Sequence, residues 1–410
     1  MDKSFHIGNR KKLYDMLQAD SVLVLFSGVE IRKSADAYYP FYADRNFVYL
    51  TGIEQKESVF IAQKHMDGSC TECLYLLPKD HMAERWTGKR LTPDEAEALS
   101  GIADIRVLDR FSEDFAANAA HVVYLDLHKQ VPEDIDRLAH VFAKTLAEIY
   151  PDRECKDMNP YVRKLRTIKQ PCEIEALRKA EQMTKAGILA MMKASHPGMY
   201  EYQYKAEFDR AFGQFSPREA GFQSIISVGT NNFCIHYDAY SGQAQDGDMV
   251  LNDVGAQWDN LIVDVSRGWP CNGKFTDRQK LLYNCALKTS DYLFSVICPG
   301  MKMKDVDATI RSYNAQLLVE AGVMDSIDDV GTYMWHGGAH HIGYDVHDAV
   351  MMPEVIEAGM VFCVDVGIYH EAWGIGFRLE DNCLVTETGC ENLSADIPRT
   401  IEEIEAVMCK

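Results

Sequence analysis

The chain has 410 residues, of which 47% are hydrophobic and 25% charged, as in ordinary globular proteins. It carries 62 acidic against 42 basic side chains, a formal net charge of −20, so nucleic acid and anionic membrane are not expected as partners. No stretch reaches the ~20 apolar residues of a membrane span, and the N-terminus lacks a signal-peptide core. The twelve cysteines therefore indicate reduced thiols in a cytoplasmic protein.

The first 150 residues alternate apolar runs with helical stretches. A helix is expected over residues 1–20 and an α/β sheet domain after it. The expected strands are Val22–Phe26, Phe47–Thr51, Val59–Ala62, Leu74–Leu77, Ile105–Leu108 and Val122–Leu125. The expected helices lie near Thr92–Ser100, Asp114–Ala119 and Pro132–Ile149.

A polar segment with two prolines, Tyr150 to Pro160, separates a second part of the chain. We therefore predict two domains, over residues 1–159 and 160–410. In the second, helices are expected over Cys172–Lys193, Met199–Phe212, Thr276–Cys298 and Met303–Ala321. Strands are expected over Gly221–Val228, Val361–Val366, Phe377–Leu379 and Cys383–Thr386, which makes this part α+β.

The stretch MVLNDVGAQWDNLIVDVSRGW, starting at Met249, has two β-rich runs around a polar turn and predicts a hairpin. A turn centred between Trp258 and Asp259 would place Asp253 directly opposite Asp264, with Cβ atoms roughly 4.5–5.5 Å apart. Two carboxylates so close among apolar residues repel each other and resist burial, and a divalent metal relieves both problems. Taken alone, the hairpin is explained equally well by two solvated aspartates.

Other residues of the ligand type follow. The stretch WHGGAHHIGYDVH holds four histidines among glycines that oppose a helix, so at least one histidine is expected to bind metal. Asp365 interrupts an apolar strand, where an unpaired carboxylate is costly. Arg378 and Glu380 share one face of a strand. Asp253, Asp264, Asp365 and Glu380, with His340, would balance two divalent cations that polarise a carbonyl and hold a hydroxide.

Several motifs resemble those of the metallopeptidases that include aminopeptidase P, prolidase and methionine aminopeptidase. They are CIHY, LNDVGA, DVSRGWPCNGKF, HGGAHHIGYDVHD, AGMVFCVDVGIY and FRLEDNCLVTETGCENL, in this order. NRKKL, ADAYYPFYADRNFVYLTGIEQKESVF and AERWTGKRL resemble the N-terminal domain of aminopeptidase P, which methionine aminopeptidase lacks. The resemblance implies a ribonuclease H-like α/β N-terminal domain and an α+β pita-bread (creatinase/aminopeptidase) catalytic domain.

The resemblance also implies an activity and a site. The expected enzyme is a metalloexopeptidase, a Xaa-Pro aminopeptidase or dipeptidase, acting on peptides with proline at the second position. Its two divalent ions, Mn²⁺ first and Co²⁺, Zn²⁺ or Fe²⁺ as alternatives, would be held by Asp253, Asp264, His340, Asp365 and Glu380. The expected catalytic residues are His236, His347 and Glu380. The expected substrate-binding residues are His336, Arg378 and Trp86, with Trp86 covering the active site of a neighbouring subunit in a homodimer or homotetramer.

One position departs from the family, which has glutamate, usually followed by proline, where this chain has Asp365-Val366. Aspartate is shorter by one carbon–carbon bond, about 1.5 Å, whereas catalytic groups need placement within about 0.5 Å. A strand shift, a bridging water or a weakly bound metal would each accommodate the change. The alternative function is therefore a catalytically silent pita-bread protein that binds a peptide or partner. A metal-free hydrolase resembling creatinase is a weaker alternative, since its acids would be buried without counter-ions.

Overall fold

The computed structural model describes residues 1–216 and 218–409 of the chain. It comprises two compact units, Met1–Leu165 and Arg166–Lys410, each with its own cluster of buried apolar side chains. The expected domain boundary between residues 159 and 160 lies at the start of helix α7 (Asn159–Thr167). The division between the units lies within that helix.

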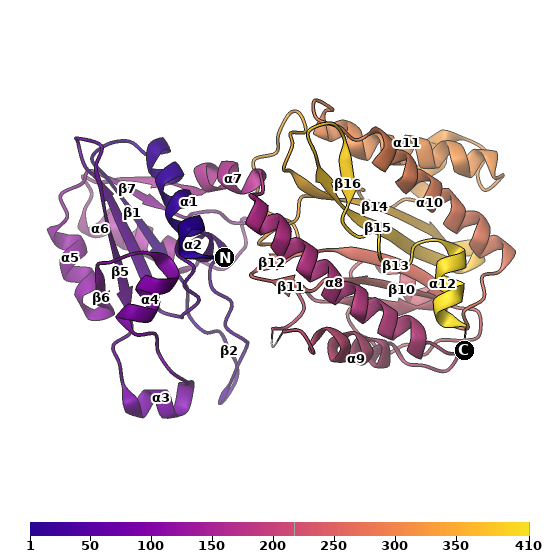
Figure 1. The fold of residues 1–410 in the computed structure, drawn as a ribbon, viewed down its shortest axis with the longest axis horizontal. Helices are drawn as coiled ribbons and strands as arrows, with labels where there is room; N and C mark the ends of the chain where they lie inside the picture. Colours follow the sequence, from indigo (N-terminus) through magenta and orange to yellow (C-terminus); the bar gives the residue numbers. More distant parts are fainter. Residues whose placement is uncertain (217, 410) are drawn as a thin grey trace. The chain divides into compact units, whose positions relative to one another are not determined.

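The first unit is built on a mixed six-stranded sheet in the order β6-β5-β4-β1-β7-β8 (Figure 1). Central strand β1 runs antiparallel to β4 and parallel to β7. The sheet strands are β1 (Ser21–Phe26), β4 (Val59–Lys64), β5 (Cys70–Leu76), β6 (Ile105–Val107), β7 (Val122–Leu125) and β8 (Glu154–Asp157), and β2 (Arg32–Ser34) pairs with β3 (Ala37–Tyr38). The helices are α1 (Lys3–Met16), α2 (Arg45–Thr51), α3 (His81–Thr87), α4 (Pro93–Ser100), α5 (Phe111–Ala117) and α6 (Leu138–Ile149). This is the α/β architecture that the sequence predicts.

One predicted strand in this unit is wrong, because Phe47–Thr51 belongs to helix α2. The Asp44 carboxylate accepts hydrogen bonds from the backbone N–H groups of Asn46 and Phe47, both at 3.0 Å, and so caps the helix N-terminus. Gly52, with φ 70°, ends the helix in the left-handed conformation. A short apolar run has the same hydrophobicity in a buried strand and a buried helix, so the flanking caps decide which one forms.

The second unit contains two three-stranded antiparallel sheets, β13-β10-β9 and β14-β15-β16, and the short pair β11-β12. Its strands are β9 (Ile225–Val228), β10 (Met249–Val254), β11 (Gln257–Trp258), β12 (Leu261–Ile262), β13 (Val265–Pro270), β14 (Val361–His370), β15 (Ile375–Val385) and β16 (Cys390–Asn392). Its helices are α8 (Pro171–Ala194), α9 (Glu201–Phe212), α10 (Asp277–Val296), α11 (Met303–Glu320) and α12 (Ile401–Met408). The α+β class of this unit agrees with the sequence analysis.

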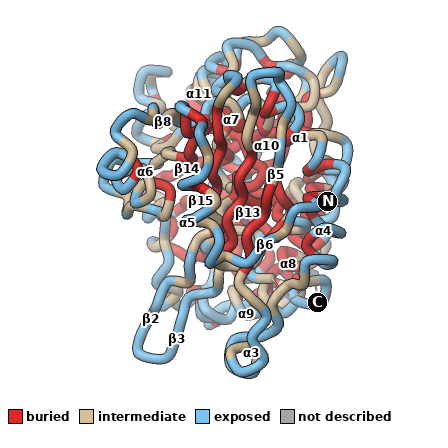
Figure 2. The backbone as a smooth tube through the Cα atoms, turned by 90° about the vertical axis from the view of Figure 1, so that its left-hand side faces the viewer, coloured by how far each residue is buried: buried red, intermediate tan, exposed pale blue. Residues whose placement is uncertain are grey.

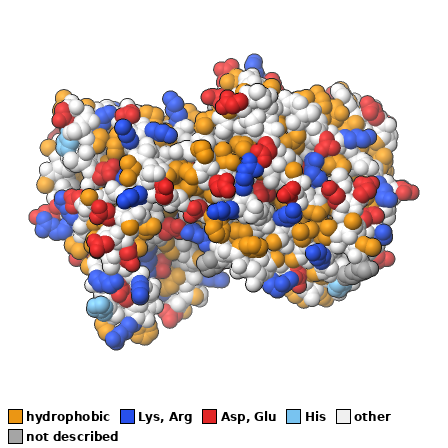
Figure 3. All heavy atoms as spheres, viewed as in Figure 1, with side chains coloured by type: hydrophobic (Ala, Val, Ile, Leu, Met, Phe, Trp, Pro, Cys, Tyr) orange, Lys and Arg blue, Asp and Glu red, His pale blue; other side chains and the backbone are white. Residues whose placement is uncertain are grey.

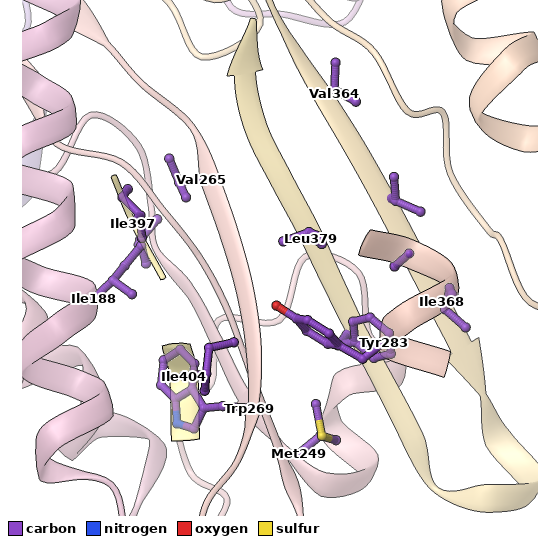
Figure 4. Packing of buried hydrophobic residues seen from close by; sticks show 14 of the residues in the cluster. Ile188, Met249, Val265, Trp269, Tyr283, Val364, Ile368, Leu379, Ile397 and Ile404 are labelled. Atoms are coloured by element: carbon purple, nitrogen blue, oxygen red, sulfur yellow. The ribbon is translucent and has the colours of Figure 1, made fainter. Parts of the chain in front are cut away.

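The apolar faces of these sheets pack against the helices. Strands β13, β14 and β15 are buried along their whole length (Figure 2). Figure 4 shows Ile188 from α8, Tyr283 from α10, Trp269 from β13 and Leu379 from β15 in one continuous core. Because successive strand residues point to opposite faces, this packing leaves the other face of each strand to polar side chains.

β15 is a single strand, whereas the sequence predicts two strands separated by Glu380, Asp381 and Asn382. Asp381 continues the strand because its carboxylate is paired with the guanidinium groups of Arg267 at 2.7 Å and Arg399 at 3.1 Å. A buried charge with such partners no longer opposes a buried strand.

The molecular surface carries acidic and basic side chains interspersed over the face in Figure 3. Within residues 1–216 and 218–409, every helix is too short or too polar to cross a membrane.

Candidate metal centre

The predicted hairpin of β10 to β13 forms, but its centre lies one residue further along the chain. Asp259 and Asn260 form the two-residue turn, with left-handed φ values of 51° and 68°. As a result Asp253 pairs with Ser266, and the expected direct pairing with Asp264 is wrong. The shift moves each partner by two residues, so Asp264 stays on the same face of the hairpin and lies diagonally across from Asp253.

The second pair of strands brings further acids to the centre. Asp365 of β14 lies directly opposite Glu380 of β15, and Cys363 lies opposite Asn382. Opposed residues share a face, as do residues two apart on one strand, so Cys363, Asp365, Arg378 and Glu380 all point to the same side. Ser266 joins the two sheets there, because its hydroxyl donates to Glu380 Oε2 at 2.9 Å.

The glycine-rich histidine loop is bound along the edge of β14. The backbone N–H of Cys363 donates to the His340 carbonyl, and that of Asp365 donates to the Gly338 carbonyl, both at 2.8 Å. A Cβ at Gly338 would lie 2.7 Å from the Asp365 carbonyl oxygen, so this close approach requires glycine. The loop therefore places His340 Nε2 3.5 Å from Glu380 Oε1 and 3.6 Å from Asp264 Oδ2.

Four donor groups lie within 4.8 Å of one another: Asp264, His340, Cys363 and Glu380. Sequence analysis missed Cys363, although its position two residues before Asp365 in an apolar strand implies the same face. Asp365 is turned instead toward His336, with Oδ2 3.3 Å from Nδ1.

The protein neutralises the acids of this centre only in part, because Arg378 pairs with Asp253 alone among them. The Oδ1 atoms of Asp253, Asp264 and Asp365 are buried without a hydrogen-bond partner among the described residues. Burial, followed by repulsion from Asp253 and Glu380, raises the pKa of Asp264 well above its usual range. Burial and then repulsion from Glu380 raise the pKa of Asp365 to about 7, against the opposing effect of His336. Burial lowers the pKa of His340, but the neighbouring carboxylates outweigh this and raise it.

This donor set fits divalent metal ions. Clustered carboxylates with one imidazole match the ligands of Mn²⁺, Fe²⁺, Co²⁺ and Zn²⁺, and bound cations would compensate the charges that the protein leaves uncompensated.

A hydrogen-bonded network extends from the centre to one side. Arg378 donates to Asp253 Oδ2 and to the hydroxyl of Tyr369, both at 3.0 Å. The same hydroxyl lies 2.9 Å from His336 Nε2, and His336 in turn contacts Asp365. Sequence analysis missed Tyr369, whose only sequence signal is its place on β14 at an even spacing from Cys363 and Asp365.

A cavity of about 320 Å³ opens onto the centre. It is lined by Asp253, Asp264, His236, His347, Phe222, Gln223, Ile225, Tyr237, Asp238 and Val346. The ring centroids of His340 and His347 are 4.2 Å apart. Burial, and then the nearby His340 and His236, lower the pKa of His347 to about 4, so its imidazole is neutral at pH 7.

The structure therefore brings Asp253, Asp264, His336, His340, Asp365, Arg378 and Glu380 together, with His236 and His347 at the cavity. Trp86 belongs to the first unit, where it lies on α3 with 85% of its surface exposed.

Comparison with known proteins agrees with this geometry. The profile of "Metallopeptidase family M24" matches residues 175–387, just over half of the chain. The chain belongs to metallopeptidase family M24. The profile "Aminopeptidase P, N-terminal domain" matches residues 6–124. These matches confirm the resemblance to aminopeptidase P.

Individual M24 relatives match over nearly the whole chain. The Xaa-Pro aminopeptidase of Escherichia coli is 29% identical over 97% of this chain and 96% of its own length. A solved structure assigned to aminopeptidase P of Bacillus anthracis is 35% identical with a TM-score of 0.97, covering 100% of this chain and 98% of that one. Aminopeptidase P from E. coli with the inhibitor Pro-Leu is 29% identical with a TM-score of 0.92 over the same shares.

These structures confirm the predicted two-domain fold, an aminopeptidase P N-terminal domain followed by the M24 pita-bread domain. As an M24 metallopeptidase the chain uses divalent metal ions, for which the cluster of Asp264, His340, Cys363 and Glu380 is a candidate site.

Proposed function

We propose that this chain is a dinuclear metal-dependent exopeptidase that hydrolyses the peptide bond before proline. The carrying observation is the cluster of carboxylates of Asp253, Asp264 and Asp365, each with a buried Oδ1 that has no hydrogen-bond partner among the described residues, next to Glu380 and His340. Asp253 and Asp264 line the cavity. The Xaa-Pro aminopeptidases among its relatives support the choice of substrate.

The proposed ligands of the two ions are Asp253, Asp264, His340, Asp365 and Glu380. When bound, such ions polarise the scissile carbonyl and supply a water-derived nucleophile at neutral pH. We propose Mn²⁺ as the principal native ion, because most of the donors are carboxylate oxygens.

The remaining steps fall to protein side chains. We assign to Glu380 the proton that leaves the attacking water and passes to the imino nitrogen of proline as the C–N bond breaks. Its other oxygen accepts the hydrogen bond of Ser266 at 2.9 Å, which fixes the orientation of the carboxylate. His347, neutral at pH 7, and His236 line the cavity, where we propose that they bind the substrate carbonyl and assist proton transfer.

The network of Arg378, Tyr369 and His336 holds the substrate side of the centre. Arg378 is 2% exposed and its contact with Asp253 at 3.0 Å fixes that carboxylate. Of this network, we propose that His336 and Arg378 contact the peptide.

We further propose a homodimer or homotetramer in which Trp86 covers the active site of a neighbouring subunit. The exposed apolar side chains of α3, Trp86 at 85% and Met82 at 61%, support an interface at this helix. A cytoplasmic location is proposed because all twelve cysteines are free thiols.

The test is hydrolysis of a Xaa-Pro dipeptide and a Xaa-Pro-Yaa tripeptide by the full chain, with Mn²⁺ and with a chelator. We expect cleavage that needs the metal and is abolished in Glu380→Gln, and the preferred length assigns the aminopeptidase or the dipeptidase activity. Intact peptides after incubation with folded, metal-loaded protein would favour the peptide-binding alternative.

A further inference from the structure

We propose that the Cys363 sulfur is itself a metal ligand, together with Asp264, His340 and Glu380, and that it favours Zn²⁺, Co²⁺ or Fe²⁺ over Mn²⁺ at the His340 site. This inference rests on the proposed function only in assuming a metal centre, and it refines which ion one of the two sites prefers.

The first support is distance. Cys363 Sγ lies within 4.8 Å of donor atoms of Asp264, His340 and Glu380, whereas Asp365 is not part of that group in the described chain. Four ligands bound to one tetrahedral zinc at about 2.0–2.3 Å lie roughly 3.3–3.8 Å from one another. Small side-chain rotations therefore bring the four donors onto one ion.

The second support is the position of Cys363 on β14. It precedes Asp365 by two residues and so points to the same face, diagonal to Glu380 on β15. Its backbone N–H donates to the carbonyl of His340 at 2.8 Å, which holds this part of β14 against the histidine loop. The sulfur is thus held at the centre by the sheet register.

The third support is its surroundings. Cys271, Cys285 and Cys383 are also buried, but they belong to the apolar core cluster, as buried thiols ordinarily do. Cys363 is fully buried and does not belong to that cluster. Instead the side-chain amide of Asn382 donates to its sulfur at 3.8 Å, and carboxylates surround it. A thiolate is a softer donor than a carboxylate, so this position selects thiophilic ions.

The fourth support is Asp365. Its carboxylate is not among the four clustered donors of the described chain, and its Oδ2 lies beside His336 Nδ1 at 3.3 Å. With Asp365 turned toward His336, Cys363 is the side chain that β14 contributes to the cluster of Asp264, His340 and Glu380.

The experiment compares wild type with Cys363→Ala and with Cys383→Ala, a matched truncation of a buried cysteine that faces the apolar core. Titration with Co²⁺ should give a thiolate-to-cobalt charge-transfer band in the near ultraviolet for wild type and Cys383→Ala but not for Cys363→Ala. Zn²⁺ affinity, measured by competition with a chromophoric chelator, should fall at least about tenfold in Cys363→Ala, with a smaller change for Mn²⁺. Asp365→Glu in the Cys363→Ala background should restore Zn²⁺ affinity without restoring the band.

Should Cys363→Ala fail to fold, X-ray absorption of zinc-loaded wild type tests the same point through a Zn–S distance of about 2.3 Å. A wild-type spectrum without sulfur, or a cobalt band that persists in Cys363→Ala, overturns the proposal. Peptide hydrolysis with no sulfur ligand would refute this inference alone, whereas a sulfur ligand without hydrolysis would refute the proposed activity alone.

Discussion

Replacing Asp348 by asparagine should destabilise the second unit and disturb the cavity. The Asp348 carboxylate is completely buried between Arg166 and Lys169, with Lys169 Nζ at 2.7 Å from Oδ2. Its backbone N–H donates to the His341 carbonyl at 2.8 Å, and it directly follows His347. The ion cluster therefore fixes the end of the histidine loop.

The lowered pKa of Asp348 and the charges of Arg166 and Lys169 set the size of the expected loss of stability. Burial raises the pKa of Asp348, but Arg166 and Lys169 outweigh this and hold it at about 2, below its ordinary 3.8. A carboxyl group whose pKa is lower in the folded state stabilises that state at pH values above its pKa in the unfolded chain. This contribution is lost as the pH falls through the pKa of the folded state. The difference between these two pKa values corresponds to roughly 2–3 kcal/mol at neutral pH. Removing one partner of a buried ion pair costs about 3–5 kcal/mol, so we expect the free energy of unfolding to fall by about 2–5 kcal/mol.

Urea unfolding at pH 7 measures this loss in the free energy of unfolding. Asp345→Asn is the matched control, because Asp345 also contacts Arg166, at 2.8 Å, but its side chain is 38% exposed. The control should lose less than about 1 kcal/mol. The difference between wild type and Asp348→Asn should narrow as the pH falls from 4 toward 2. Equal losses in the two variants would refute the reasoning.

Burial raises the pKa of Glu181 to about 8 from 4.5, so the folded state keeps a proton that the unfolded state releases between these values. The free energy of unfolding of wild type therefore falls as the pH rises through this range. Urea titrations should show Glu181→Gln to be more stable than wild type by at most about 5 kcal/mol above pH 8, and equally stable below pH 4.5. Gly338→Ala puts a Cβ 2.7 Å from the Asp365 carbonyl oxygen. Urea unfolding should show a free energy of unfolding lower by about 1–3 kcal/mol, and titration calorimetry should show weaker binding of Zn²⁺. His347→Ala should lower kcat/KM for a Xaa-Pro peptide at least about 100-fold, while elemental analysis shows an unchanged metal content. A parallel loss of metal would contradict the role assigned to His347.

Local patterns in the sequence determined most elements and the membership of each strand face. The apolar spacing of Cys172–Lys193 predicts α8, and the two-residue period predicts that Arg378 and Glu380 share a face. These properties depend only on helix and strand geometry and on which side chains avoid water. The family motifs added the expected ligands, because their order along the chain is specific.

Other features depended on contacts between segments far apart in sequence. The pairing of Asp253 with Ser266 depended on where Asp259 and Asn260 turn, and a shift of one residue in that centre changes every partner. Cys363 joined the centre because Asp365 pairs with Glu380 across β14 and β15. Periodicity assigns a side chain to a face, but only the register between strands decides which side chains on that face meet.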